Sequence, residues 1–257
     1  MNYLENRPKV GLALSGGVAR GPVHVGVLTV LEREGIPIDC VAGASAGSLV
    51  GSAYCAGLEI PEMRELALQT GWHNVAALAW PRQGFVSFAK MEPFLENRLG
   101  KLDIRDLSIP FAAVATDMRR GEQVILREGR LATAVRASCS VPGFITPVEL
   151  DGMLLCDGGV SDNLPVDALR EMGADYVIGV DLFVPNQPKW GPFGMGAIAI
   201  ETLVRQSGGG YKAADCLILP DLAGKSYLRF SYAEEYIAIG EDAAKAAVPV
   251  IKEALAL

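Results

Sequence analysis

Short, continuously apolar runs alternate with helix-like segments along this chain, and this alternation constrains its fold more than any other feature. The run at 9–14, KVGLAL, is apolar on both faces of an extended chain, which is typical of a strand inside a parallel sheet. Further strands are expected at 38–42, 111–116, 124–126, 153–156, 176–182 and 216–219. Helices are expected at 23–34, 45–56, 61–70, 91–99, 131–137, 165–172 and 233–257, the last broken near Pro249. This order predicts a three-layer α/β/α fold with a mostly parallel central sheet.

No internal repeat or linker divides the 257 residues. We therefore expect one domain over 1–257, with core motifs at 9–182 and a C-terminal strand and helix within 212–257. Aromatic residues without periodicity occupy 71–90, which predicts a loop. The segment 184–196 is rich in proline and glycine and is expected to be a mobile loop. Aromatic residues at 72–88 and 183–193 also favour a hydrophobic substrate or a movable lid, with a dimer contact as the alternative.

The net charge of −7 argues against binding to nucleic acid, where affinity comes from neutralising phosphates. No Lys/Arg cluster suggests electrostatic docking on an anionic membrane. The five cysteines lack metal-ligand spacing, so we expect reduced thiols in a cytoplasmic protein and neither metal nor cofactor. The start of the chain does not resemble a signal peptide. The uncharged stretch 41–58 is long enough for a membrane helix, but its small residues favour a strand, a tight turn and a buried helix.

A G-x-S-x-G sequence lies between an expected strand and an expected helix: Gly43, Ala44, Ser45, Ala46 and Gly47. This context is what a nucleophile elbow requires, because the chain must reverse sharply with the serine pointing outward. The helix that follows also favours developing negative charge beside Ser45. The alternative is a tight turn whose serine only caps the helix.

A base for this serine is not supplied by an obvious histidine. The chain has only His24 and His73, and neither follows a strand after Ser45, so an α/β-hydrolase triad is disfavoured. Asp157 ends an apolar strand and precedes two glycines, which predicts a carboxylate at the active edge of the sheet. Burial beside the serine would raise its basicity. The alternative is a simple Asp-Gly turn.

A glycine-rich loop, SGGVARG at 15–21, connects the first expected strand to the first expected helix. Backbone N–H groups in such a loop can converge on an anion, including the oxyanion of acyl transfer. A dinucleotide fingerprint fails because Val18 stands where the second glycine belongs, and no Walker A lysine follows. Arg20 is expected to hold the loop or attract a phosphate-bearing substrate, with a surface arginine as the alternative.

Together the three motifs resemble the patatin-like phospholipases, which combine a G-G-x-x-R/K-G loop, a G-x-S-x-G elbow and an Asp-Gly-Gly/Ala motif in this order. Here they stand at 16–21, 43–47 and 157–159. The flanking segments HVGVLTVLEREGIPID, RASCSVPGFITPV and GGVSDNLPVDALREMGADYVIGVDL match as well. The resemblance covers 9–182 strongly, extends more loosely beyond, and is closest to the small single-domain bacterial members. It implies the patatin-like fold.

The resemblance further implies a serine–aspartate dyad that hydrolyses lipid acyl esters, such as phospholipids or lysophospholipids, without a metal. Ser45 would be the nucleophile and Asp157 the proton acceptor. The implied oxyanion loop contains Gly16, Gly17 and Val18, with motif support from Arg20, Gly21, Gly43, Gly47, Gly158 and Gly159.

The sequence departs from the family's glycine-rich motif at Val18, where many members have a third glycine. A positive φ at this valine would be strained. We expect Gly17 and Val18 to donate and Gly16 to allow the turn. The alternatives are a non-catalytic regulator or lipid-binding protein that keeps the fold, and an esterase or thioesterase without a membrane role. Transient contact with a membrane surface and the oligomeric state are left open.

Overall fold

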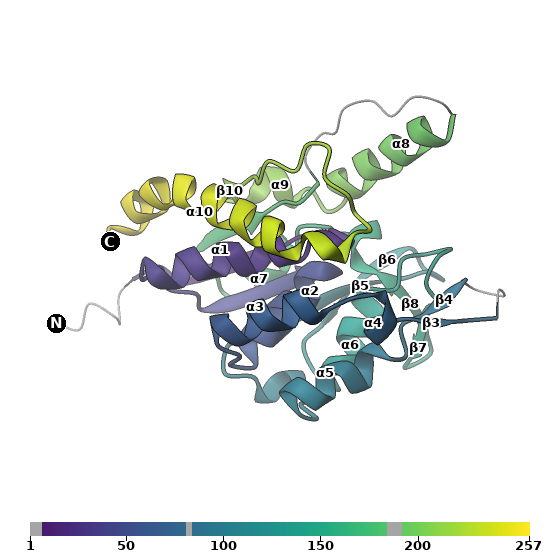
Figure 1. Ribbon diagram of the computed structural model, residues 1–257. Helices are drawn as coiled ribbons and strands as arrows, with labels where there is room; N and C mark the ends of the chain where they lie inside the picture. Colours follow the sequence, from purple (N-terminus) through teal and green to yellow (C-terminus); the bar gives the residue numbers. More distant parts are fainter. Residues whose placement is uncertain (1–6, 81–83, 184–191) are drawn as a thin grey trace.

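The computed structural model describes residues 7–80, 84–183 and 192–257 and contains an 8-stranded sheet (Figure 1). The strand order is β10-β9-β1-β2-β5-β8-β7, and β6 also pairs with β5. The pairs β1–β2, β1–β9, β9–β10 and β2–β5 are parallel, and the pairs that join β5, β6, β7 and β8 are antiparallel. The strands are β1 (Val10–Leu14), β2 (Cys40–Ala44), β5 (Phe111–Asp117), β6 (Glu122–Leu126), β7 (Val148–Leu150), β8 (Met153–Asp157), β9 (Tyr176–Val180) and β10 (Cys216–Ile218). The expected mostly parallel sheet is confirmed.

Helices cover both faces of this sheet, which confirms the three-layer arrangement. The larger hydrophobic cluster joins the sheet to α1 (Pro22–Arg33), α2 (Ala46–Cys55), α3 (Ile60–Gln69), α5 (Met91–Leu99), α6 (Leu131–Ser138) and α10 (Ala233–Leu255). The smaller cluster lies under α7 (Val166–Glu171), with Tyr211 of α9 (Gly210–Ala213) packed against it. The central strands β1, β2 and β5 are fully buried because both of their faces are covered.

The C-terminal helix α10 packs closely on α1, and two glycines permit this approach. A Cβ on Gly26 would lie 2.0 Å from the carbonyl oxygen of Ile237, and a Cβ on Gly240 would lie 2.0 Å from that of Val23. Any larger residue at either position would force the helices apart. Since β10 pairs with β9, the C-terminal segment belongs to the same sheet and core.

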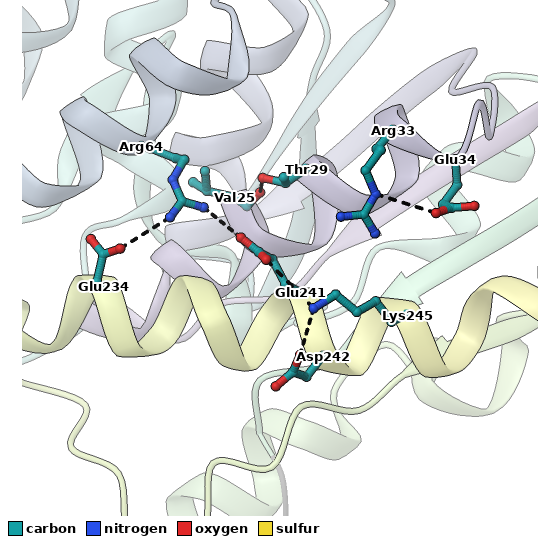
Figure 2. A network of polar contacts seen from close by, with 9 residues as sticks. All are labelled: Val25, Thr29, Arg33, Glu34, Arg64, Glu234, Glu241, Asp242 and Lys245. Carbon is teal, nitrogen blue, oxygen red and sulfur yellow. Dashed lines mark hydrogen bonds and ion pairs between the residues drawn. The ribbon is translucent and has the colours of Figure 1, made fainter.

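Charged side chains also join α10 to α3, as Figure 2 shows. Arg64 lies 2.7 Å from Glu241 and 3.3 Å from Glu234. Such partly exposed pairs contribute about 0.2–1 kcal/mol each. Burial of a side chain such as Ile237 or Ile251 contributes about 1.5–3 kcal/mol. The apolar face of α10 therefore supplies most of the docking energy, and the ion pairs fix its orientation.

Two expectations are wrong. The last helix does not break at Pro249: α10 is continuous, and the exposed proline lies on its solvent side, where water can satisfy the carbonyl that the missing N–H leaves free. The segment 71–90 is not a plain loop, because it forms α4 (Trp72–Val75) and the hairpin strands β3 (Ala77–Leu78) and β4 (Val86–Ser87). These elements are too short to produce a periodic pattern.

The expected mobile loop at 184–196 falls partly outside the described residues, since 184–191 are not among them. From Pro192 the chain forms α8 (Pro192–Gln206), a helix that was not expected from the sequence. The uncharged stretch 41–58 forms β2, a turn and α2, as expected. In the described residues, no helix is long and apolar enough to cross a membrane. All five cysteines are buried and free.

Candidate active site

Strand β5 brings Ser45 and Asp157 together. Residues 113–117 of β5 pair with β6 along one edge. The opposite edge is shared: Val114 pairs with Ala44 of β2, and the next residue, Ala115, pairs with Asp157 of β8. Because β2 is parallel and β8 antiparallel to β5, the two strands run toward each other and end at the same point. The residues that meet there are Ser45, which follows β2, and Asp157, which ends β8.

The turn at Ser45 is sharp and strained. Ser45 has φ 50° and ψ −122°, a conformation that non-glycine residues rarely adopt and that is typical of a nucleophile elbow. Close packing forces this turn, since a Cβ on Gly43 would lie 2.5 Å from the backbone of Gly47, and one on Gly47 would lie 2.1 Å from the Leu14 carbonyl oxygen. The N–H of Ser45 donates to Ser138 Oγ at 2.8 Å, which holds the elbow against α6.

Asp157 is nearly inaccessible, with 7% of its surface exposed. Its Oδ1 accepts the N–H of Gly159 at 2.8 Å. Its Oδ2 is buried and accepts no hydrogen bond of standard geometry from the described residues. Burial raises the pKa of Asp157 to about 6, and the Ser45 hydroxyl and the Gly159 N–H oppose this rise. The carboxylate is thus a stronger base than an exposed aspartate and has one oxygen free to receive a proton.

The glycine-rich loop lies directly beside Ser45. A Cβ on Gly16 would lie 3.1 Å from Ser45 Cβ. The N–H of Gly16 donates to Asn163 Oδ1 at 3.1 Å, so this group is already paired. The N–H groups of Gly17 and Val18 donate to no partner in the described part of the chain. Val18 has φ 52°, the positive value that a valine adopts at a cost of about 1–2 kcal/mol.

Arg20 is fully buried rather than on the surface. Its guanidinium donates to the carbonyl oxygens of Leu182 at 3.1 Å and Lys225 at 2.6 Å, and lies 3.5 Å from the ring centre of Tyr227. These contacts join the glycine-rich loop to two distant segments of the chain. No phosphate-sized anion could reach this side chain without opening the fold.

The remaining motif glycines lie at close backbone contacts around the two functional side chains. A Cβ on Gly21 would lie 3.3 Å from Ala46 Cβ, where α1 meets the start of α2. A Cβ on Gly158 would lie 2.2 Å from the carbonyl oxygen of Val114, and one on Gly159 would lie 3.0 Å from Asp157 Oδ1. Side chains at these positions would separate the strand ends.

Neither histidine lies where a triad needs it. His24 is buried in α1, with Nε2 bonded to the Ser15 carbonyl oxygen at 2.9 Å, and burial lowers its pKa to about 4. It is therefore neutral at physiological pH and supports the glycine-rich loop. His73 is exposed on α4. Among residues 7–80, 84–183 and 192–257, no group of three His, Cys, Asp or Glu side chains is placed to hold a metal ion.

Sequence reasoning missed Ser138 and Asn163, which position the elbow and the glycine-rich loop. Ser138 accepts the Ser45 N–H and donates to the Val114 carbonyl oxygen at 2.5 Å. Asn163 is 1% exposed and bridges the loop at Gly16 to the segment after Asp157. Both residues stand in the flanking segments RASCSVPGF and GGVSDNLPV, but nothing in those segments distinguishes them from other polar residues.

An apolar cavity of about 330 Å³ opens beside Ser45. Its walls are almost entirely hydrocarbon and aromatic, and come from α2, α4, β4, α5 and several connecting segments, including the glycine-rich loop, the loop after α6 and the segment before α10. The lining residues are Val18, Ser45, Ala46, Leu49, Thr70, Trp72, Val75, Val86, Phe88, Met91, Cys139, Val141, Phe144, Ile145, Leu228 and Phe230. A second cavity of about 50 Å³ shares Val18, Ala46, Leu49, Thr70 and Phe230 with it. This site suits a long apolar group attached to a carbonyl carbon at Ser45.

Comparisons with known proteins agree with this geometry. The sequence model of a family described as patatin-like phospholipase matches residues 12–170. An uncharacterized NTE family protein of Mycobacterium tuberculosis is 38% identical over 178 residues, which cover 68% of this chain and 49% of that protein. The lysophospholipase NTE1 of Scheffersomyces stipitis is 35% identical over 179 residues, which cover 67% of this chain and 12% of that protein. The chain spans about half the length of the mycobacterial relative.

The neuropathy target esterase sws of Drosophila melanogaster is 34% identical over 181 residues, which cover 67% of this chain and 13% of that protein. Among solved structures, VipD from Legionella pneumophila matches 97% of this chain and 67% of its own, with a TM-score of 0.58 and 14% identity. At this identity the match shows a shared fold alone.

Proposed function

Because the chain belongs to the patatin-like phospholipase family, we propose that it hydrolyses acyl esters of lipids with Ser45 as nucleophile and Asp157 as general base. The observation that carries this proposal is the meeting of β2 and β8 on one edge of β5, which brings Asp157 close to Ser45, a residue that lines an apolar cavity. The names of two relatives, a lysophospholipase and an esterase, favour the same class of substrate.

The first half of the reaction acylates the enzyme. Ser45 Oγ attacks the ester carbonyl carbon while its proton passes to Asp157 Oδ2, the carboxylate oxygen without a hydrogen bond. The carbonyl oxygen becomes an oxyanion, which the free N–H groups of Gly17 and Val18 are available to bind. When the intermediate collapses, the alcohol leaves with the proton from Asp157, and the acyl group stays on Ser45.

The second half releases the fatty acid. Water attacks the acyl carbon, Asp157 takes its proton, and the same oxyanion donors stabilise the second intermediate. Ser45 recovers the proton as the carboxylic acid leaves. The apolar cavity holds the acyl chain throughout, so the acyl group stays in place while the alcohol leaves and water enters.

The proposal is tested with lysophosphatidylcholine and a p-nitrophenyl ester series, together with labelling by a fluorophosphonate and mapping of the labelled peptide. We expect hydrolysis of both substrate types and a label on Ser45. If the protein hydrolyses neither ester and takes no label, a non-catalytic lipid-binding role replaces the enzyme.

Hydrolysis should depend on pH through Asp157. Its carboxyl must be ionised to accept a proton, so kcat/KM should rise with pH, pass its midpoint near 6 and then level off. Below that midpoint we expect about a tenfold loss for each pH unit. Asp162 is a second buried carboxyl near Asp157 in the sequence, and burial raises its pKa to about 7. Asp162→Asn is therefore the matched control and should keep the midpoint of the kcat/KM profile near 6. A profile that stays flat down to pH 4 would contradict the role of Asp157.

Leu49 should limit acyl-chain length, because it lies between the two cavities, one helical turn after Ser45. Leu49→Ala would join the cavities and favour chains too long for the wild type. Each extra buried methylene should raise kcat/KM about fourfold, since its burial contributes about 0.8 kcal/mol. The measurement is kcat/KM across the ester series. Leu68→Ala, at an exposed position on α3 outside both cavities, is the control, and an unchanged chain-length optimum in Leu49→Ala would refute this limit.

A further inference from the structure

The mouth of the Ser45 cavity is surrounded by exposed hydrophobic side chains. Three cavity-lining residues are themselves exposed: Trp72, Phe144 and Leu228. Beside them, the β3–β4 hairpin exposes 95% of Leu78, 82% of Trp80 and 64% of Phe85. We call these six side chains the hydrophobic rim. Exposing so many large apolar groups together is costly in water, so the rim points to a partner.

Hydrogen bonds hold the rim together as one surface. The N–H of Phe85 donates to the Phe144 carbonyl oxygen at 2.9 Å, which ties the hairpin to the loop after α6. The indole N–H of Trp72 donates to the Leu228 carbonyl oxygen at 3.1 Å, which ties α4 to the segment before α10. In Figure 1 the hairpin projects from the right-hand end of the molecule, next to α4. The hairpin and α4 are therefore each bonded to a segment that lines the cavity.

The charge of the rim segments differs from that of the chain. The chain has 30 acidic residues and a net charge of −7. Yet the segments 71–80, 84–90, 141–148 and 226–232 contain no Asp or Glu, and they carry Lys90 and Arg229. Segments that expose apolar side chains, lack acidic residues and carry two cations suit the headgroup region of a lipid bilayer, including one with anionic lipids.

We infer that the hydrophobic rim docks the protein on a lipid surface, so that an acyl chain moves from the lipid phase into the Ser45 cavity without crossing water. This inference rests on the proposed function, because it assigns the same cavity a lipid substrate. The geometry favours it: Phe144 and Leu228 are exposed and line the same cavity as Ser45, and Phe85 of the exposed hairpin is bonded to Phe144. An acyl chain that crossed water between the bilayer and the cavity would expose its apolar surface, which is unfavourable.

The test compares two double variants in the Ser45→Ala protein, which cannot degrade the vesicles. Leu78→Glu/Trp80→Glu puts charges on the rim at positions that do not line the cavity. Ile200→Glu/Leu203→Glu is the matched control, since α8 exposes 64% of Ile200 and 70% of Leu203 away from the hairpin (Figure 1). Binding is measured by cosedimentation with phosphatidylcholine vesicles, with and without phosphatidylglycerol.

We expect the rim variant to lower vesicle partitioning about tenfold or more, and the α8 variant to leave it unchanged. With Ser45 restored, the rim variant should hydrolyse a water-soluble p-nitrophenyl ester at the wild-type rate, which also shows that it is folded, but should hydrolyse vesicle lipids poorly. Unchanged partitioning in the rim variant would overturn the inference. An equal loss in both variants would also overturn it.

Two further outcomes separate this inference from its rivals. If the rim variant turns a dimer into a monomer in analytical ultracentrifugation and still binds vesicles, the rim is a contact between copies of this chain and the inference is wrong. If the wild type hydrolyses no ester, but the Ser45→Ala protein binds vesicles through the rim, the docking surface stands and the proposed function fails.

Discussion

Ser45→Ala should lower kcat for ester hydrolysis by about 10⁵–10⁶-fold and abolish fluorophosphonate labelling. The change removes the proposed nucleophile, and in serine hydrolases the loss of the nucleophile costs about this much. The fold should persist, because alanine can take the same φ of 50° as readily as serine, and because Asp157 Oδ2 has no hydrogen-bond partner of standard geometry among the described residues that the change could remove. The measurement is steady-state hydrolysis of a p-nitrophenyl ester, with circular dichroism of both proteins.

Ser52→Ala is the matched control for this loss. Ser52 lies on α2, the helix that follows Ser45, and its hydroxyl donates to the Leu49 carbonyl oxygen at 2.8 Å, outside the cavity. Its activity should be unchanged. The double variant Ser45→Ala/Asp157→Asn should be no less active than Ser45→Ala alone, because the two groups act in one step. A further large drop in the double variant would mean that Asp157 supports a second nucleophile.

Asp157→Asn should lower kcat by about 10³–10⁴-fold, since an amide cannot accept the proton of Ser45. The same change should stabilise the protein. Raising a carboxyl pKa from 3.8 to about 6 costs the folded state about 3 kcal/mol at neutral pH, and asparagine avoids this cost. The Gly159 N–H keeps an acceptor, because the amide oxygen can replace Oδ1. Ester hydrolysis and urea unfolding measure the two effects.

The raised pKa of Asp157 also determines how the free energy of unfolding depends on pH. A carboxyl with a raised pKa favours folding only while protonated, so wild-type stability falls as the pH rises from about 4 through 6. Asp157→Asn lacks this fall, so the two proteins should unfold alike near pH 3 and differ by about 2–3 kcal/mol above pH 7. A destabilised Asp157→Asn at pH 7 would mean that the carboxylate is a structural anion, and the proposed base would have to be another group.

The sequence alone was sufficient for the elements that depend on local patterns. The apolar residues at 10–14 and 177–180 are buried on both faces, and this local pattern predicted β1 and β9. The expected helix at 91–99 agrees with α5. The turn at Ser45 could be predicted because glycines at 43 and 47 permit a reversal that side chains would block. Where local pattern was weak, as in the hairpin at 77–87 and in α8, the prediction failed.

The relation between these elements was decided by the tertiary structure. Nothing near Ser45 in the sequence indicates that β8 approaches from the opposite direction, because Ser45 and Asp157 lie more than a hundred residues apart and meet only through the pairing of β2 and β8 with β5. The carbonyl oxygens that hold Arg20, and the pairing of the Gly16 N–H with Asn163, come from equally distant segments. The cavity walls do too, since Trp72, Phe144 and Leu228 have no local signal in common. The local sequence determines which backbone conformations are low in free energy at each residue. Burial, the raised pKa of Asp157 and the shape of the cavity arise only when distant segments pack together and exclude water.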